Sequence, residues 1–413
     1  MSTIAEVSAV AAKPKAALAF SWLAVVLCAA TMFVEGYDAQ LMGYVVPGIA
    51  RDWGVAPPSL TPAIASGLVG MALGAFFIAP LADSYGRRKL VLYSVIVFAI
   101  LTVATAYATT LPVLVILRFL TGVGLGGAMP NAIAITAEFS PARWRAWIVA
   151  VMFCFYSLGA GFGGLIAAWL VPMYTWKAVL IFCGGMALIL WPILVFAMPE
   201  SYVPDGQPKP KLPVRRLFEN GRGRVTIFLW IIFFANLMEI FFLTSWLPLT
   251  LSQQGLTEAN SAYATSLVQF AGVGAALFMG LLVDRFGPQR VLPPAFVLTA
   301  LCVAGIGLAG SAVPLTMLMA AGIGIGTVGA QNCNNGVAAK LYPTSIRATG
   351  VGWALAVGRI GSILGPVIGA ILLSTMVDIR TIFLVAAVPP LVAAGAYIAM
   401  GRTPALEPAA NEV

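Results

Sequence analysis

The sequence contains no histidine, and its five cysteines stand alone within apolar stretches. Imidazole is the usual group for proton transfer near neutral pH and is, with thiolate, a common ligand of zinc. The chain therefore lacks an imidazole proton relay and the paired spacing of a Cys and His metal site. It also lacks a nucleophile motif, so we expect no metal, no cofactor and no enzymatic activity. The cysteines are interpreted as packing residues: Cys28, Cys154, Cys183, Cys302 and Cys333.

Charged residues are scarce as well. They make up 9% of the 413 residues, whereas apolar residues make up 61% and the mean hydropathy is +0.97. This composition excludes a water-soluble domain. Apolar runs of about 18 or more residues recur along the chain, and each is long enough to cross a bilayer. We predict an all-α membrane protein with twelve transmembrane helices at residues 18–48, 60–82, 90–109, 112–138, 145–171, 176–198, 225–251, 259–283, 291–310, 313–340, 347–375 and 380–400.

The positions of the 23 Lys and Arg residues indicate how these helices are oriented. Basic residues accumulate in short cytoplasmic loops, and with both termini in the cytoplasm only Arg51, Lys177 and Arg380 fall on the outer side. The net charge of +8 then follows from topology, so we expect no nucleic-acid partner. Lys13 and Lys15 resemble the start of a signal peptide, but the apolar run continues through carboxylates and further runs follow. We predict a multi-pass protein of a bacterial inner membrane.

The second half of the sequence repeats the first. At an offset of 201 residues Asp38 coincides with Glu239, Pro47 with Pro248, Gly54 with Gly255, Asp83 with Asp284, and Gly86 with Gly287. A Pro-rich basic segment too polar to cross a membrane separates the copies. Parallel repeats of this kind predict two six-helix bundles related by pseudo-two-fold symmetry around a midplane site. The predicted domains are a cytoplasmic tail 1–17, an N-terminal bundle 18–198, a cytoplasmic linker 199–224, a C-terminal bundle 225–400 and a cytoplasmic tail 401–413.

Two motifs carry a family resemblance that covers nearly the whole chain. PLADSYGRRK, with GLLVDRFGPQR at the matching place in the second half, resembles the G-x-L-A-D-R-x-G-R-[KR] loop of the major facilitator superfamily, with Ala79 and Ser84 as departures. FVEGYDAQLMGY is similar to the D-G-[YF]-D signature of the aromatic acid:proton symporter branch, with Glu35 replacing the first Asp. The loop is expected to act as a conformational latch, or else only as a positive-inside anchor. Its residues are Asp83, Gly86, Arg87, Arg88, Asp284, Arg285 and Gly287.

Apart from Glu138, which ends the fourth predicted helix beside a basic cytoplasmic loop, three carboxylates away from the latches lie inside predicted transmembrane helices: Glu35, Asp38 and Glu239. A charge near the bilayer centre costs about 2.5–3.5 kcal/mol, so each is a candidate functional group. Arg118 lies at a depth similar to that of Asp38, and we predict that the two form an ion pair. These four residues are the candidate proton-coupling groups, with Asp38 as the main proton site and Glu35 as a neighbour that tunes it. The alternative is a purely structural role, which for Glu239 means a pair with Arg359.

Arg359 lies near the midplane in a G-R-x-G element similar to one of the aromatic acid branch. A guanidinium fork matches a carboxylate, so the resemblance implies that it holds the substrate's carboxylate. The string GAQNCNNG adds a cluster of amides, and nearby aromatic residues supply candidate stacking surfaces. The alternative is that the amides only link helices and the aromatics only pack. The remaining candidate substrate-binding residues are Gln331, Asn332, Asn334, Asn335, Tyr37, Tyr156 and Trp353.

The resemblance implies a secondary active transporter that works by alternating access. We expect it to import small aromatic or related organic acids by proton symport, as a monomer whose partners are the acid, protons and lipid. Benzoates, hydroxybenzoates, phenylpropionates and ring-cleavage products all suit one Arg and several amides. The alternative is a drug or metabolite/proton antiporter of the same fold. Antiporters carry G-x-x-x-G-P-x-x-G-G in the fifth helix, whereas FYSLGAGFGG here has Ala160 in place of the proline, which favours import.

Overall fold

The computed structural model describes residues 21–141, 143–201, 214–219, 221–343, 346–375 and 378–401, and within them the regular elements are helices. Twelve helical segments in this part of the chain are long and apolar enough to cross a membrane, as predicted. Two of them contain a short π-helical turn, η3 (Gly74–Ile78) and η6 (Ile325–Gly329). The helices are α1 (Trp22–Trp53), α2 (Thr61–Leu73), α3 (Ala82–Tyr85), α4 (Arg87–Thr105), α5 (Leu111–Glu138), α6 (Arg145–Met173), α7 (Trp176–Ala197), α8 (Gly223–Gln253), α9 (Glu258–Phe286), α10 (Pro288–Ala309), α11 (Val313–Gly324), α12 (Ala330–Leu341), α13 (Arg347–Ser374), α14 (Ile379–Ala386) and α15 (Val388–Met400).

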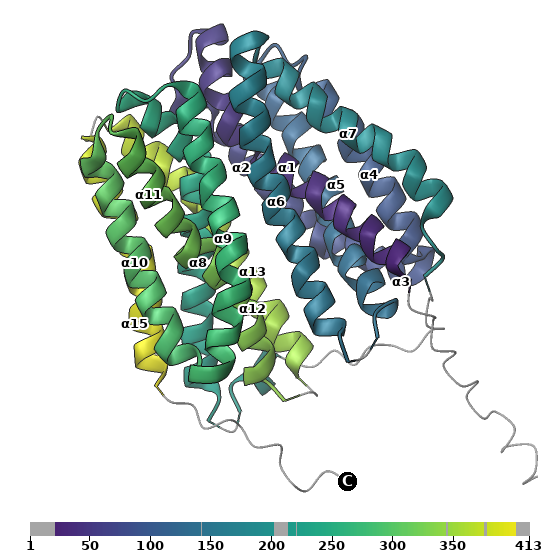
Figure 1. Ribbon diagram of the computed structural model, residues 1–413. Helices are drawn as coiled ribbons and strands as arrows, with labels where there is room; N and C mark the ends of the chain where they lie inside the picture. Colours follow the sequence, from purple (N-terminus) through teal and green to yellow (C-terminus); the bar gives the residue numbers. More distant parts are fainter. Residues whose placement is uncertain are drawn as a thin grey trace, which may run out of the picture.

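The helices form two groups that repeat one packing scheme, an N-half of α1 to α7 and a C-half of α8 to α15 (Figure 1). In the N-half α1 packs on α6, α2 on α5, and α4 on α7; in the C-half α8 packs on α13, α9 on α11, and α10 on α15. Each C-half pair is the repeat counterpart of an N-half pair. The contacts between the halves follow the same rule, because α6 against α9 corresponds to α13 against α2. The predicted fold of two parallel six-helix bundles is therefore confirmed.

Matching glycines show the repeat at the level of the backbone. Gly86 ends α3 and Gly287 ends α9, with φ values of 92° and 83°, and Gly54 and Gly255 follow α1 and α8 with φ values of 65° and 99°. Only glycine adopts such values without strain. The limits predicted for the linker and the two tails remain predictions, because residues 1–20, 202–213 and 402–413 lie outside the described part.

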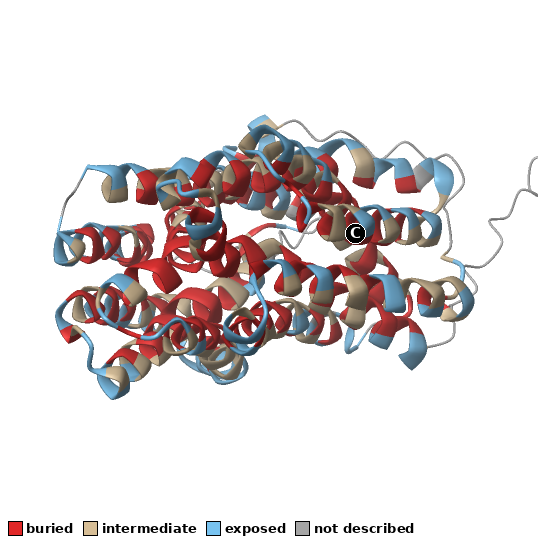
Figure 2. Ribbon diagram, turned by 90° about the horizontal axis from the view of Figure 1, so that it is seen from above, coloured by how far each residue is buried: buried red, intermediate tan, exposed pale blue. Residues whose placement is uncertain are grey.

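The two halves are closed against each other at the end of the molecule away from the start of α1 and the end of α15. There a Cβ on Gly43 of α1 would overlap the carbonyl oxygen of Thr244 of α8. Gln269 of α9 donates a hydrogen bond to Gln40 of α1 at 3.4 Å, and Arg51 forms an ion pair with Glu258. Towards the start of α1 and the end of α15 the ribbons of the two halves diverge (Figure 1). Figure 2 shows buried residues concentrated between the helices and exposed ones on the outer faces, as expected for lipid-facing surfaces.

Candidate functional site

The predicted ion pair between Asp38 and Arg118 is present in the middle of the N-half. Arg118 Nη1 lies 3.0 Å from Asp38 Oδ1, and Nη2 donates to the Asp38 carbonyl oxygen at 3.3 Å. The side chain of Asp38 is fully buried, and that of Arg118 is 3% exposed. Removing two charges from water is unfavourable unless each is paired and hydrogen-bonded, so this contact holds α1 to α5.

Two further residues complete the shell of Asp38. The Thr102 hydroxyl of α4 donates a hydrogen bond to Asp38 Oδ2, and the Cys183 thiol of α7 lies 3.9 Å from the same oxygen. Neither was predicted, because a single Thr or Cys in an apolar helix carries no signal that separates a hydrogen-bond donor from a packing residue. Both oxygens of Asp38 thus have hydrogen-bond donors beside them.

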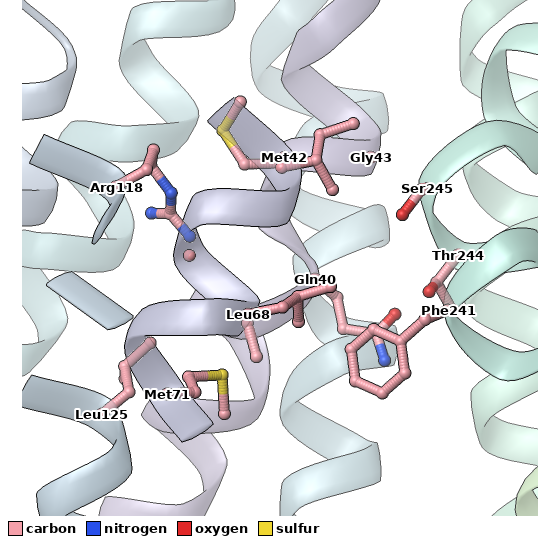
Figure 3. Close-up of a pocket in the computed structure, with 13 residues that line it drawn as sticks. Gln40, Met42, Gly43, Leu68, Met71, Arg118, Leu125, Phe241, Thr244 and Ser245 are labelled. Atoms are coloured by element: carbon pink, nitrogen blue, oxygen red, sulfur yellow. The ribbon is translucent and has the colours of Figure 1, made fainter. Parts of the chain in front are cut away.

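A small cavity lined in part by Arg118 lies between α1, α2, α5 and α8 (Figure 3). Its volume of about 20 Å³ is enough for one water molecule. Four polar side chains line it: Gln40, Arg118, Thr244 and Ser245. Arg118 Nε is buried and has no hydrogen-bond partner among the described residues.

Glu35 has an environment unlike that of Asp38, although it lies one turn away on α1. Its side chain is fully buried, and within the described residues neither carboxyl oxygen has a hydrogen-bond partner. Gly36 brings α1 so close to α6 that a Cβ there would overlap the Tyr156 carbonyl oxygen. Tyr156 and Arg359 both interact electrostatically with Glu35, and Arg359 comes from the opposite half.

Arg359 is a partly buried cation without an ion-pair partner among the described residues. The polar contact of its Nη2 is with the Met129 thioether of α5, at 3.8 Å, and a thioether is a weak acceptor. On α13 the exposed residues Gly352, Leu355 and Ala356 precede Arg359 by seven, four and three positions. These spacings place all four on one helix face.

Glu239 occupies in α8 the position that Asp38 has in α1, but it lacks the partners. Its side chain is 1% exposed, and neither carboxyl oxygen has a hydrogen-bond partner in the described chain. The ion pair with Arg359 that the sequence left open is not formed within these residues. One turn earlier, Asn236 donates to Gln331 Oε1 at 2.8 Å and to the Thr327 carbonyl oxygen of the π-helical turn at 3.3 Å. Asn236 was not predicted.

The amides of α12 are engaged in contacts within the C-half. Gln331 accepts from Asn236 of α8 and donates to Asn335 at 3.4 Å, while Asn332 donates to the Val328 carbonyl oxygen one turn earlier. Asn334 accepts a 2.6 Å hydrogen bond from Tyr397 of α15. Gln331 and Asn334 therefore link α12 to neighbouring helices, whereas Gln331, Asn332 and Asn335 stay partly exposed.

The three predicted aromatic residues are not brought together. Tyr37 is fully buried and donates to the Val179 carbonyl oxygen of α7, inside the N-half. Trp353 stacks on Trp230 of α8 with ring centroids 5.8 Å apart. It lies six residues before Arg359, about 240° around the helix, and so on another face. Tyr156 is packed through its backbone against Gly36, the residue after Glu35.

The latch residues contact the ends of other helices of their own half. Arg87 forms an ion pair with Glu138 at the end of α5, and Arg88 pairs with Glu200 and donates to the Val195 carbonyl oxygen at 2.6 Å. In the C-half Asp284 pairs with Lys340 at 2.5 Å, on the surface, and Arg285 lies over the Phe286 ring. The side chain of Asp83 lies outside the described residues. In the described part no cluster of three or more Cys, Asp or Glu side chains could hold a metal ion.

Comparison with known proteins identifies the family. The family model of the Major Facilitator Superfamily matches residues 28–353 and 229–412. The chain is 34% identical to the gallate transporter of Pseudomonas putida, over 93% of this chain and 92% of the relative. It is 36% identical to the 4-hydroxybenzoate transporter PcaK of Acinetobacter baylyi (86% and 85%) and 32% identical to the 3-(3-hydroxy-phenyl)propionate transporter of Escherichia coli (94% and 96%). A crystal structure of a bacterial homologue of the lysosomal transporter Spinster matches with a TM-score of 0.72 at 16% identity, over 92% and 96% of the chains.

The chain therefore belongs to the major facilitator superfamily and is a multi-pass membrane transporter rather than an enzyme. The relatives also confirm the resemblance to the aromatic acid branch that the motifs in the first half indicated. The similarity to the Spinster homologue, at 16% identity, shows a shared fold.

Proposed function

We propose that this protein imports aromatic or related organic acids together with protons. The observation that carries the proposal is Arg359, a guanidinium without an ion-pair partner in the described chain, whose Nη2 contacts Met129 of the opposite half. An arginine in that position needs an anion, and a carboxylate fits its fork. The names of three relatives, for gallate, 4-hydroxybenzoate and 3-(3-hydroxy-phenyl)propionate, point to aromatic acids as the substrate class.

The negative charge of the substrate favours a proton gradient as the driving force. Entry of a monoanion alone is opposed by an inside-negative membrane potential, by about 2.3 kcal/mol per 100 mV. A proton that travels with the anion removes this term. With no histidine in the chain, the groups available to carry it are the buried carboxyls of α1 and α8.

Alternating access explains why the two halves meet at one end and diverge at the other. With both termini in the cytoplasm of a bacterium and the protein in its inner membrane, the closed end that contains Gly43 and Arg51 faces outward, and the diverging end faces inward. Rocking of the two halves about Arg359 then exposes the site to each side in turn. The latch contacts stay within one half, so they stiffen each bundle as it moves. One chain contains both halves, and we propose that it works as a monomer.

The proposal is tested with purified protein in proteoliposomes and labelled 4-hydroxybenzoate, gallate and benzoate. An imposed pH gradient, acidic outside, is expected to drive accumulation that a protonophore abolishes. Counterflow without a gradient separates transport from simple binding. If the labelled acid instead accumulated only when the vesicle lumen was acidic, so that the acid entered as protons left, the protein would be assigned to proton antiport and efflux. Absence of counterflow with every aromatic acid would reject the substrate class.

Closure of the outer end predicts the effect of Gly43→Ala. The added Cβ would overlap the Thr244 carbonyl oxygen, so α1 and α8 can no longer meet there. Overpacking costs about 1–3 kcal/mol, enough to reduce the closed population about tenfold. Spin labels on Val55→Cys and Gln253→Cys, in a background with the native cysteines replaced, should report a longer distance, and uptake should fall.

The matched control is Gly274→Ala in α9, where a Cβ would meet nothing within 4 Å. It should leave both the label distance and uptake unchanged. An unaltered distance in Gly43→Ala would mean that this contact does not hold the outer end closed.

A further inference from the structure

A groove with a volume of about 440 Å³ lies in the C-half, between α8, α13 and α15. The helix α15 packs on α8 and α10 of its own half, and it runs along the edge of the C-half away from the N-half (Figure 1). Three apolar residues that line the groove are about half exposed: Ile227 (49%), Val388 (52%) and Val392 (45%). The groove is therefore open at the surface of the molecule.

The part of α13 that lines the groove faces away from the contact between the halves. Arg359 reaches Met129 of the N-half, whereas Val357 of the groove lies two residues earlier, about 200° around the helix. Trp353 and Ile360 precede and follow Val357 by four and three positions, so they share its face, and both are large exposed apolar residues. This face of α13 is suited to contact with lipid, and the groove lies within it.

The lining is apolar throughout. The indole N–H of Trp230 is the one polar side-chain group among the ten residues, and none of them carries a charge. The carboxylate of an aromatic acid would have no ionic partner there, and an unpaired buried charge is strongly unfavourable. The groove therefore suits a hydrocarbon ligand. Its residues are Ile227, Trp230, Ile231, Phe234, Ala235, Met238, Val357, Val388, Pro389 and Val392.

The length of the groove matches the depth of one lipid leaflet. The lining residues of α8 follow one another at helical spacing from Ile227 to Met238, which is a rise of about 16 Å. The hydrocarbon of one leaflet is about 15 Å deep, half of the bilayer core. Since α8 begins at Gly223, the groove starts near the membrane surface and ends near the midplane. This depth and a volume within the usual range for ligand sites fit one acyl chain.

A cation lies at the surface end of the groove. Arg224 precedes Ile227 by three residues and so lies on the same face of α8. Its side chain is exposed, and its Nη2 donates to the Ala399 carbonyl oxygen of α15 at 2.5 Å, which joins two of the helices that form the groove. Among the described residues no carboxylate pairs with it. The repeat position in the N-half, 201 residues earlier, is Leu23, so this cation belongs to the C-half alone.

We propose that this groove binds one acyl chain of an anionic phospholipid whose phosphate lies against Arg224. A guanidinium at the level of the lipid headgroups attracts a phosphate, and four of its five N–H groups remain for it. The site is separate from the substrate site and does not depend on which acid is transported. In the orientation proposed above, the lipid belongs to the cytoplasmic leaflet. The chain fills the space between α13 and α15 over α8, so binding stabilises the C-half.

The test offers delipidated protein, in a nonionic detergent, equal amounts of dioleoylphosphatidylglycerol and dioleoylphosphatidylcholine. Native mass spectrometry counts the lipids retained, and thermal unfolding gives the Tm with each lipid. The wild type should retain one phosphatidylglycerol with about a fivefold preference, the contribution of one basic residue near a charged lipid. Its Tm should rise more with this lipid. Arg224→Gln should remove the preference but still retain a chain, whereas Val392→Trp, which places an indole in the groove, should retain neither lipid.

Two controls make the same changes on α10, outside the groove. Arg290→Gln removes an exposed charge near the start of that helix, on the same side of the membrane as Arg224, and Val297→Trp enlarges a residue that is 40% exposed. Both should behave as the wild type. Equal retention of the two lipids by the wild type would overturn the proposal, as would retention by Val392→Trp or an equal loss of preference in Arg290→Gln.

The same measurements identify other occupants of the groove. Displacement of the retained lipid by 4-hydroxybenzoate would assign the groove to the transported acid and reject the proposal. A dimer in the mass spectrum of the wild type that Val392→Trp abolishes would mean that a second copy of the chain covers it, which would also reject the proposal.

Discussion

Replacing Asp38 with Asn is expected to abolish uptake and substrate exchange together, and to destabilise the protein. The substitution keeps the shape of the side chain but leaves the Arg118 charge, 3% exposed, without a counter-ion. Breaking a buried ion pair by removing one partner costs about 3–5 kcal/mol. Thermal unfolding in detergent should show a clearly lower Tm, and counterflow in proteoliposomes should be lost.

Two further variants show whether the pair is the cause. Removing both charges in Asp38→Asn with Arg118→Gln should recover much of the lost Tm, because no charge is then left unpaired. Thr102→Val removes one donor to Asp38 and keeps the ion pair, so its effect on Tm should be smaller. Should Asp38→Asn keep the wild-type Tm and substrate exchange while losing accumulation, Asp38 would be the proton carrier that the sequence favours.

The membrane helices were predictable because hydropathy reports directly on the solvent of each segment. The predicted and the observed helices differ at their ends. The first helix was expected to end at residue 48, but α1 continues through Arg51 and Asp52 to Trp53, where Gly54 caps it in the left-handed conformation. Helices extend past the apolar run into the polar interface, so an apolar window places their ends several residues too early.

The Asp38 and Arg118 pair was predictable for a different reason. A helix rises by a fixed amount per residue, so two charges in neighbouring helices can be assigned depths from the sequence alone. An unpaired charge is so unfavourable in a membrane that equal depth nearly determines the partner.

The uncharged parts of the site were not predictable in this way. Thr102 and Cys183 reach Asp38 because α4 and α7 are rotated to face it, and rotation depends on packing along the whole helix. Asn236 is a single amide that gains a role only through the partner it finds on α12. Trp353, in contrast, could have been excluded from the site by its sequence position. It lies six residues from Arg359, and this spacing places it on another face of the helix, where it stacks on Trp230.

Replacing Arg359 with Lys is expected to weaken binding of aromatic acids although the positive charge is kept. A guanidinium presents two parallel N–H groups to a carboxylate, whereas an ammonium acts as a point charge. Loss of one charge-assisted hydrogen bond costs about 1.5–3 kcal/mol, which corresponds to a Kd about 10-fold to 100-fold higher. Calorimetry with 4-hydroxybenzoate measures this change, and Arg359→Gln, which also removes the charge, should abolish detectable binding.

The control for this substitution is Arg51→Lys at the closed end, whose exposed pair with Glu258 lies away from the site and should leave Kd unchanged. An unchanged affinity in Arg359→Lys would mean that the substrate carboxylate does not bind on α13. The next cation to examine would then be Arg118, whose unpartnered Nε borders the cavity between α1 and α8.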